Sequence, residues 1–394
     1  MVAAYPPPPP PAITARAAVV VDGDTGQVLF ARNPHEELPN ASTTKLMTAL
    51  VAVSNGNLNQ VVTVSTDSAR VGGSSLYLEA GERMTLEQLL YGMLMISGND
   101  AADAIARAVG GSDEHFVAMM NARAASMHLT DTHYANPHGL PDPDHYTSAY
   151  DLTVIARAAF ANPEIAKITD TRTLVMQGND RIKRRFLVNH NKLLGRFDGA
   201  LGGKTGYTRL AGRCFVGSAR RNGRFVIEAV LHSRRLWHDS AALLNYGLDD
   251  FQNYAAVAQN TIEGQVPVQG GQDKTVTAVL AQPAQVSVPK GDPGTGIVPR
   301  VLLDPQVVAP VAANQPLGQL ELTRAGSVLA SFPLVAQQAD SKGVPLTRRL
   351  LTALGWFFSG GLISFGLFGA VRWRLLRMRR RDRRPAARVA AQRS

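Results

Sequence analysis

Three short motifs carry residue types that can form and break an acyl bond. Ser42 and Lys45 stand three residues apart in the first motif, Ser-Thr-Thr-Lys. A serine hydroxyl is a poor nucleophile at its own pKa, and it needs an adjacent base when it attacks an acyl carbon. Residues three apart on a helix share a face, so this motif can supply both groups. We therefore expect Ser42 to be a nucleophile and Lys45 to be its base.

A lysine base has to be partly neutral. This requires desolvation or a nearby positive charge. Lys204, in the third motif Lys-Thr-Gly, could supply that charge if it lies opposite Lys45. A lone Ser-x-x-Lys would instead indicate a helix N-cap with a solvated lysine. The companion motifs favour the catalytic interpretation of Ser42.

The second motif, Ser97-Gly98-Asn99, falls at a predicted break between two helices, where side chains can project into a cleft. The Ser97 hydroxyl can pass a proton between Lys45 and a leaving amine. The Asn99 amide can hold the substrate backbone or position Lys45. An ordinary interhelical turn is the alternative for this tripeptide taken alone.

The third motif offers groups that bind a carboxylate. We expect Lys204 and Thr205 to begin an edge strand, where a cation and a hydroxyl can hold a substrate carboxylate. We expect Gly206 to let the substrate approach the backbone closely.

Metal and redox chemistry have little support in the sequence. His138 and His145 could suggest a metal pair, but they fall in a loop without a third ligand, so we expect structural roles. We expect no metal and no other cofactor. The single cysteine, Cys214, excludes an internal disulfide.

The first elements around these motifs can be predicted from apolar patterns. Residues 17–32 contain two apolar runs around Asp-Gly-Asp-Thr-Gly, which predicts a hairpin. Apolar residues at helical spacing after Ser42 predict a helix that stops at Gly56. The spacing of Thr85 and Gln88 indicates a capping box at the start of a second helix, which ends at Ser97-Gly98.

The later elements alternate in type. A short helix is predicted from about 100 to 109, and helical periodicity continues to about 160. Beyond Lys204, CFVGSAR and RFVIEAVL predict two strands joined by an Asn-Gly turn, and a helix follows from 236 to about 251. Strands at both ends enclose a helical middle, which is typical of an α/β fold with an antiparallel sheet.

The chain divides into five predicted segments. Residues 1–16 are a Pro-rich N-terminal segment, 17–253 a catalytic domain and 254–340 a small β-rich stalk domain. Residues 350–371 are a predicted transmembrane helix, and 372–394 are a basic tail.

Charge and hydropathy predict a membrane anchor. The formal net charge is +10, but ten arginines and one acid follow Val371, so a diffuse nucleic-acid-binding surface is not expected. Residues 350–371 carry no charge, and a helix of that length spans about 33 Å. The arginine-rich tail predicts a cytoplasmic C-terminus and an extracytoplasmic body. The N-terminal residues lack the pattern of a signal peptide, so either a signal segment lies upstream of this start or the terminal helix inserts as a tail anchor. We expect the first, because the chemistry of the three motifs belongs outside the cell.

Longer stretches around the motifs resemble one family. They are ASTTKLMTAL, GGSSLYLEAGERMTLEQLLYGMLMISGNDAA, ANPHGLPDPDHYTSAYDL and GGKTGYTRLAGRCFVGSA. Together with the ordered motifs they resemble the low-molecular-mass penicillin-binding proteins, the serine D-Ala-D-Ala carboxypeptidases. The resemblance implies an α/β domain like that of serine β-lactamases and DD-peptidases, then a small all-β domain and a membrane attachment.

The resemblance also implies a reaction. Ser42 would form an acyl-enzyme with the penultimate D-alanine of a peptidoglycan stem pentapeptide, and water would then hydrolyse the ester. β-Lactams would acylate the same serine. The backbone amides of Ser42 and Tyr207 would form the oxyanion hole. The implied catalytic residues are Ser42, Lys45 and Ser97, and the implied substrate-binding residues are Asn99, Lys204, Thr205, Gly206 and Tyr207.

Some alternatives stay open at this point. A D,D-endopeptidase that cuts cross-links would use the same residues. A β-lactamase shares the motif logic, but Gly98 stands where class A enzymes have aspartate. A penicillin-sequestering wall protein would acylate without turnover. His190 stands about where some relatives have an arginine, and Tyr207 stands where some have a histidine.

Overall fold

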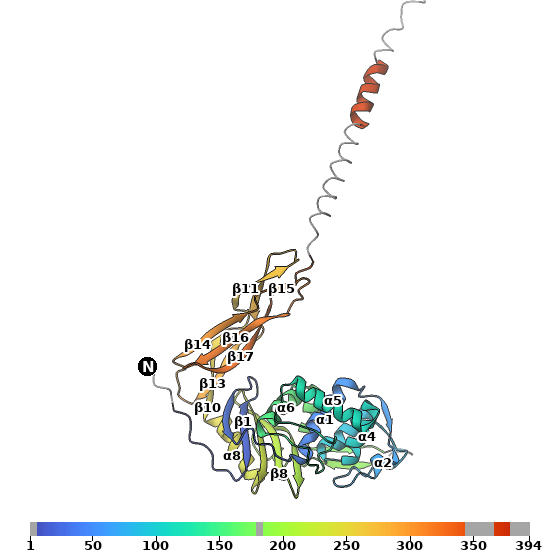
Figure 1. The fold of residues 1–394 in the computed structure, drawn as a ribbon, viewed down its shortest axis with the longest axis vertical. Helices are drawn as coiled ribbons and strands as arrows, with labels where there is room; N and C mark the ends of the chain where they lie inside the picture. The colour runs from blue at the N-terminus through green and yellow to red at the C-terminus, as the bar shows by residue number, and fades with distance from the viewer. Residues whose placement is uncertain (1–5, 179–183, 343–365, 379–394) are drawn as a thin grey trace, which may run out of the picture. The chain divides into compact units, whose positions relative to one another are not determined.

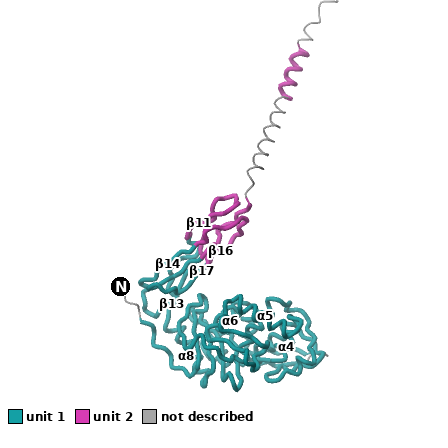
Figure 2. Tube along the Cα trace, viewed as in Figure 1, with its two compact units in different colours: residues 1–261, 282–302, 319–332 teal, residues 262–281, 303–318, 333–394 magenta. Residues whose placement is uncertain are grey.

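The computed structural model describes residues 6–178, 184–342 and 366–378 of the chain (Figure 1). The chain forms two compact units, which are coloured separately in Figure 2. The first unit contains Met1–Thr261, Gln282–Leu302 and Gln319–Phe332, and the second contains Ile262–Ala281, Leu303–Gly318 and Pro333–Ser394.

A five-stranded antiparallel sheet organises the first unit. Its strand order is β2-β1-β9-β8-β7. The predicted N-terminal hairpin is confirmed as β1 and β2. The predicted Asn-Gly hairpin is confirmed as β8 and β9, whose turn residues both have positive φ, as a tight hairpin requires. The strands are β1 (Ala17–Asp22), β2 (Val28–Arg32), β7 (Ala200–Thr208), β8 (Gly212–Arg221) and β9 (Arg224–Ser233).

Strand β7 corrects one prediction. Lys204 and Thr205 were expected to begin an edge strand, and β7 does lie at the edge of the sheet. The strand, however, already begins at Ala200, and Lys204 pairs with Val216 in its interior. Pairing with β8 extends the strand through Leu-Gly-Gly, which has weak strand propensity of its own. The third motif therefore lies in the interior of a strand, with strand residues both before and after it.

Helices cover the two faces of this sheet. Helix α8 (Leu236–Asp249) packs on one face, against apolar side chains such as Val226 and Val230 of β9. The alternate residues of β9, Ile227 and Ala229, face the helical core on the other side. This alternation follows from the two-residue period of a strand. Helix α8 ends two residues before the expected position, because Phe251 already begins a strand.

The larger core lies among the helices. The helix predicted after Ser42 is α1 (Lys45–Asn55), and its C-cap is Gly56. The predicted capping box at Thr85 is confirmed at the start of α3 (Leu86–Met95). Helix α4 (Asn99–Gly110) confirms the short helix predicted from about 100. The other elements here are η1 (Ala41–Thr44), β3 (Val61–Thr63), α2 (Thr66–Ala69), β4 (Arg83–Thr85), α5 (Asp113–Ser126), α6 (Ala149–Ala161), α7 (Pro163–Asp170), β5 (Thr173–Met176) and β6 (Arg185–Val188).

The helical periodicity predicted to about 160 is interrupted between α5 and α6, where the structure has the loop that was expected around His138. Residues 127–148 form an irregular segment with isolated bridges from Thr147 to Leu38 and from Tyr146 to His133. Three prolines and Gly139 interrupt any helix there. This segment contains both histidines that were expected to be structural.

Residues 254–340, predicted as a small β-rich domain, contain strands and irregular segments but no helix. In the first unit, β10 (Phe251–Val257) pairs with β13 (Ala284–Pro289). In the second unit, β11 (Ile262–Gln269) pairs with both β12 (Thr275–Leu280) and β15 (Val307–Val308). The remaining strands are β14 (Ile297–Leu303), β16 (Pro316–Arg324) and β17 (Ser327–Ala336).

The predicted membrane segment falls mainly outside the described residues. Residues 366–378 are helical, whereas residues 350–365 of the predicted span and 379–394 of the basic tail are not described. Within the described ranges, no helix combines the length and the apolar character needed to cross a bilayer.

Candidate active site

Ser42 and Lys45 meet at the start of α1. Ser42 lies in the 3₁₀ turn η1, and Lys45 is the first residue of the α-helix that follows. The Lys45 Nζ atom lies 2.9 Å from Ser42 Oγ. Ala41, directly before the serine, has a φ of 48°, a conformation that L-residues rarely adopt. Such local strain is common at functional sites.

Lys45 is fully buried, and its burial favours the neutral amine. Its Nζ lies 2.7 Å from Asn99 Oδ1 and 2.7 Å from the backbone oxygen of His138. Both atoms can only accept, so a neutral amine donates its two hydrogens to them. Its lone pair is then left for the Ser42 hydroxyl. Burial, with the nearby Lys204 charge, holds the pKa of Lys45 well below its ordinary value.

The His138 carbonyl is a part of this site that the sequence motifs did not indicate. The Asn136 side chain accepts from the backbone N–H groups of His138 and Gly139, which fixes the turn. Gly139 has a φ of 85°, and a Cβ there would lie 2.0 Å from the Ala41 oxygen. The stretch ANPHGL was noted for its resemblance, but only the fold places its carbonyl on Lys45.

Ser97 and Asn99 occupy the junction between α3 and α4. Ser97 has a φ of 66° and is almost fully buried. The Asn99 side chain donates to the Gly72 oxygen at 2.7 Å, which orients its own oxygen toward Lys45. Asn99 therefore positions Lys45. Ser97 contacts a different lysine.

Lys204 reaches this junction from β7. Its Nζ donates to Ser97 Oγ at 3.0 Å and to the Thr205 backbone oxygen at 2.8 Å. Burial lowers the pKa of Lys204 to about 7. The structure thus brings all three motifs together, with Ser97 next to Lys204 and Asn99 next to Lys45.

Gly206 lies where two parts of the fold approach each other closely. A Cβ at this position would lie 2.7 Å from the Asn40 oxygen and 3.1 Å from the Ser42 nitrogen. The glycine lets β7 approach the backbone beside the nucleophile. Tyr207, the next residue, is 66% exposed, so its side chain points away from this contact.

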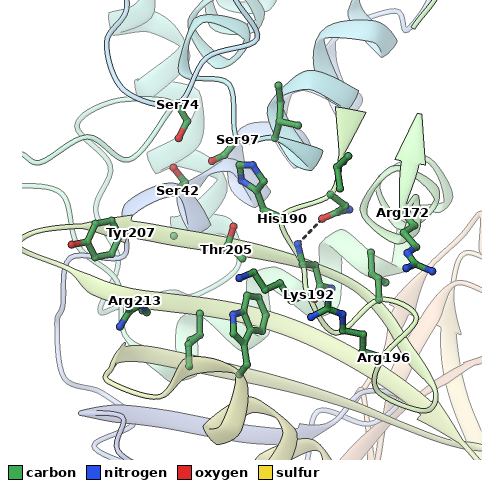
Figure 3. Close-up of a pocket in the computed structure, with 18 of the residues that line it drawn as sticks. Ser42, Ser74, Ser97, Arg172, His190, Lys192, Arg196, Thr205, Tyr207 and Arg213 are labelled. Atoms are coloured by element: carbon green, nitrogen blue, oxygen red, sulfur yellow. Dashed lines mark hydrogen bonds between the residues drawn. The ribbon is translucent and has the colours of Figure 1, made fainter. Parts of the chain in front are cut away.

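A pocket of about 1050 Å³ opens in front of these groups. Figure 3 shows the hydroxyls of Ser42, Ser74 and Ser97 at one end, with His190 beside them. His190 donates its backbone N–H to the Met95 oxygen at 3.0 Å. Burial and the Lys204 charge lower the pKa of His190. This residue is therefore a neutral imidazole at pH 7, unlike an arginine.

His145 contacts η1, the turn that contains Ser42. Its Nε2 lies 2.7 Å from Thr44 Oγ1, and its Nδ1 accepts from the Ala135 N–H at 3.2 Å. Nε2 is then the protonated nitrogen and donates to Thr44. Burial lowers the pKa of His145 to about 4. No cluster of three potential metal ligands occurs in the described part of the chain.

The geometry is that of a serine acyl-transfer enzyme, and comparisons with known proteins agree. The family "D-alanyl-D-alanine carboxypeptidase", peptidase family S11, matches residues 4–235. "Penicillin-binding protein 5, C-terminal domain" matches residues 251–342. D-alanyl-D-alanine carboxypeptidase DacF of Bacillus subtilis is 32% identical over 350 residues, which cover 87% of this chain and 90% of that protein.

Solved structures give the same result. Penicillin-binding protein 5 from Haemophilus influenzae matches with a TM-score of 0.68 and 27% identity, covering 85% of this chain and 99% of that chain. A mutant of the Streptomyces K15 DD-transpeptidase matches with a TM-score of 0.58 and 31% identity, covering 60% and 98%.

The chain belongs to the D-alanyl-D-alanine carboxypeptidase family of serine hydrolases, peptidase family S11. It is a D-alanyl-D-alanine carboxypeptidase of the penicillin-binding class, with an α/β DD-peptidase fold and a C-terminal all-β domain.

Proposed function

We propose that Ser42 attacks the carbonyl carbon of the penultimate D-alanine of a peptidoglycan stem pentapeptide. The observation that carries this proposal is the buried Lys45 amine, whose two acceptor partners leave its lone pair facing Ser42 Oγ at 2.9 Å. Lys45 takes the serine proton as the Oγ–C bond forms. The serine therefore needs no histidine.

The leaving nitrogen must gain a proton when the C–N bond breaks. The Ser97 hydroxyl is the bridging donor, and it returns to this nitrogen the proton that Lys45 removed. Ser97 Oγ accepts a hydrogen bond from Lys204 Nζ at 3.0 Å, so this hydroxyl lies beside the lysine that would hold the terminal carboxylate. D-Alanine then leaves as the free amine, and water attacks the Ser42 ester in the same way. Hydrolysis restores the serine hydroxyl and releases the shortened peptide.

Charge on the substrate is held at two places. The backbone N–H groups of Ser42 and Tyr207 stabilise the oxyanion of the tetrahedral intermediate. Lys204 and the Thr205 hydroxyl bind the terminal carboxylate. Gly206 supports this arrangement, because its missing side chain lets β7 lie against the backbone of Asn40 and Ser42.

The substrate backbone pairs with β7. This strand is at the end of the strand order in its sheet, so one of its edges is available for an extended peptide. Pairing there would align the scissile bond along the third motif, next to Ser42. A β-lactam ring carbonyl would occupy the same position and acylate the same serine.

Residues 350–371 form a membrane-spanning helix, and residues 372–394 form a cytoplasmic tail. The uncharged length of the first segment and the ten arginines of the second support this proposal. The catalytic domain, 17–253, then lies outside the cell on a β-rich stalk, 254–340. Protease added to intact cells should remove the globular body and leave the tail protected. The reverse pattern would contradict this orientation.

A paired assay tests the catalytic proposal. Purified protein should release D-alanine from a D-Ala-D-Ala peptide and should be labelled covalently by fluorescent penicillin. Ser42→Ala should abolish both. Turnover that persists in Ser42→Ala would overturn the mechanism, and labelling of the unchanged protein without any D-alanine release would indicate a penicillin-sequestering protein instead.

A further inference from the structure

The active-site pocket continues beyond the groups assigned to catalysis. It passes Thr205 and His190 and reaches the side chains of Arg172, Lys192 and Arg196. Figure 3 shows Arg172 and Arg196 at the side of the pocket away from Tyr207, with Lys192 between Thr205 and Arg196. Among the described residues, no aspartate or glutamate lines the pocket. Its far end is therefore strongly basic.

The backbone around this basic end is well fixed. The Asn189 N–H donates to the Arg172 oxygen at 2.9 Å. The Asn191 side chain accepts from the Leu193 N–H and donates to the Leu201 oxygen, which holds the turn that carries Lys192. Gly195 lies so close to Arg172 that a Cβ would be 2.8 Å from Nη1. The three cations thus project from one braced loop and the segment beside it.

The three cations have no anionic partner in the described ranges. Neither Arg172, Lys192 nor Arg196 forms an ion pair there, whereas other arginines of this unit, such as Arg107 and Arg185, do. Like charges that share a concave surface focus a positive potential into it. An anion that enters the pocket relieves their mutual repulsion.

The position of this basic end relative to the scissile bond follows from the proposed function, on which the inference rests. Lys204 and Thr205 bind the carboxylate of the terminal D-alanine, which is the last group of a stem pentapeptide. Space beyond that carboxylate lies on the leaving-group side.

We propose that Arg172, Lys192 and Arg196 form a subsite for a second carboxylate, carried by the leaving group. The favoured substrates are then peptides in which the residue after the scissile bond is acidic, or in which the amine side of a cross-link carries a carboxylate. The chemistry is unchanged: the C–N bond breaks, and the leaving amine gains the proton that Lys45 took from Ser42.

Two matched peptides test this subsite. Both have a blocked N-terminus and the sequence L-Lys-D-Ala-X, with X as D-glutamate in one and its neutral isostere D-glutamine in the other. For the unchanged protein, kcat/KM should be about tenfold higher with D-glutamate, the size expected of a few partly screened ion pairs. In R172Q/K192Q/R196Q the ratio should fall close to one.

The control variant removes the same charge elsewhere. R70Q/R83Q/R123Q changes three exposed arginines that do not line the pocket, and it should keep the D-glutamate preference. An equal loss of preference in this control would show that the effect is overall charge and would overturn the subsite. Thermal unfolding and penicillin labelling report whether each variant is folded. If the triple variant is not folded, the single variants R172Q, K192Q and R196Q are measured instead.

The outcomes separate the subsite from the proposed function. Release of D-alanine from the D-Ala-D-Ala peptide with equal rates for D-glutamate and D-glutamine would overturn the subsite alone. No release from any of the three peptides would overturn the proposed function. A D-glutamate preference that weakens as salt concentration rises would support the charge mechanism.

Discussion

Two titratable side chains of the first unit, Lys45 and Glu228, are equally buried but differ in their hydrogen-bond partners. Lys45 is fully buried beside the edge strand β7, and its Nζ contacts Ser42, Asn99 and the His138 backbone. Glu228 is fully buried in β9, on the face of the sheet covered by α8. In both, burial favours the neutral form of the group.

Glu228 lacks the partners that Lys45 has. Neither of its carboxyl oxygens has a hydrogen-bond partner among the described residues. Burial raises the pKa of Glu228 to about 8, and the neighbouring Asp239 carboxylate acts in the same direction. The Ser240 hydroxyl lies near enough to oppose this slightly, but not in hydrogen-bonding geometry.

The difference shows that a shifted pKa does not by itself make a site. Around Lys45, two acceptors aim the lone pair at a nucleophile, and a pocket gives access to the substrate. Glu228 is fully buried, and neither of its oxygens has a hydrogen-bond partner among the described residues. The same burial therefore produces reactivity at one position and only a dependence of stability on pH at the other.

Removal of the Lys45 amine should have the largest effect and tests the contrast between Lys45 and Glu228. Lys45→Met keeps much of the buried volume but removes the amine, so the rate of acylation by a fluorescent penicillin should fall about 10³-fold. Glu228→Gln, the matched change of the other buried group, should label at close to the normal rate. Similar losses in both variants would contradict the distinction.

The second effect is a decline in activity on the alkaline side. Because the pKa of Lys204 is about 7, its charged form, which binds the substrate carboxylate, disappears as the pH rises above 7. In this range kcat/KM for a D-Ala-D-Ala peptide should fall, by up to tenfold per pH unit. At acid pH, protonation of Lys45 should lower it as well. A kcat/KM that stays level from pH 7 to 9 would exclude this role of Lys204.

A smaller effect is expected from a single methyl group beside Ser42. In Gly206→Ala the new Cβ would meet the Asn40 oxygen at 2.7 Å, so β7 or the nucleophile turn must shift. Displacement of a reacting group by a fraction of an ångström should lower kcat/KM about tenfold. Thermal unfolding measured in parallel distinguishes this displacement from a loss of the fold, and full activity in a stable variant would show that the close approach is not needed.

The last effect concerns the stability of the fold at Glu228, and it should leave activity close to normal. The folded protein keeps a proton on this carboxyl up to about pH 8, whereas an ordinary glutamate loses it near 4.5. The stabilisation is therefore complete below about pH 4.5 and disappears as the pH rises to 8, by about 1.4 kcal/mol per pH unit. Glu228→Gln should remove this slope. Denaturant unfolding of both proteins from pH 5 to 8.5 measures it, and parallel curves would contradict the shifted pKa.

The elements that could be predicted from the sequence are those that short local patterns determine. The hairpin at 17–32, the capping box at Thr85 and the Asn222-Gly223 turn each depend on residues close together in the chain. The three motifs also contained the residues that the fold brings together. We could expect these residues to lie close together, because a serine nucleophile needs its base and the substrate-binding groups within reach.

The parts that could not be predicted depend on backbone atoms and on distant contacts. The His138 carbonyl carries no side-chain identity, so no motif marks it as a partner of Lys45. Strand β7 begins four residues before Lys204 because β8 pairs with it. The role of Gly206 became clear only from the backbone of Asn40, more than 160 residues away.

Because the active site is assembled from distant parts of the chain, acylation of Ser42 can report when these parts come together during folding. Lys45 meets Asn99 and His138 across 54 and 93 residues of chain, and Lys204 meets Ser97 across 107. None of these contacts can form in an isolated segment. During refolding, covalent capture of a fluorescent β-lactam by Ser42 would therefore record the moment at which helices and sheet come together, rather than the earlier formation of α1 alone.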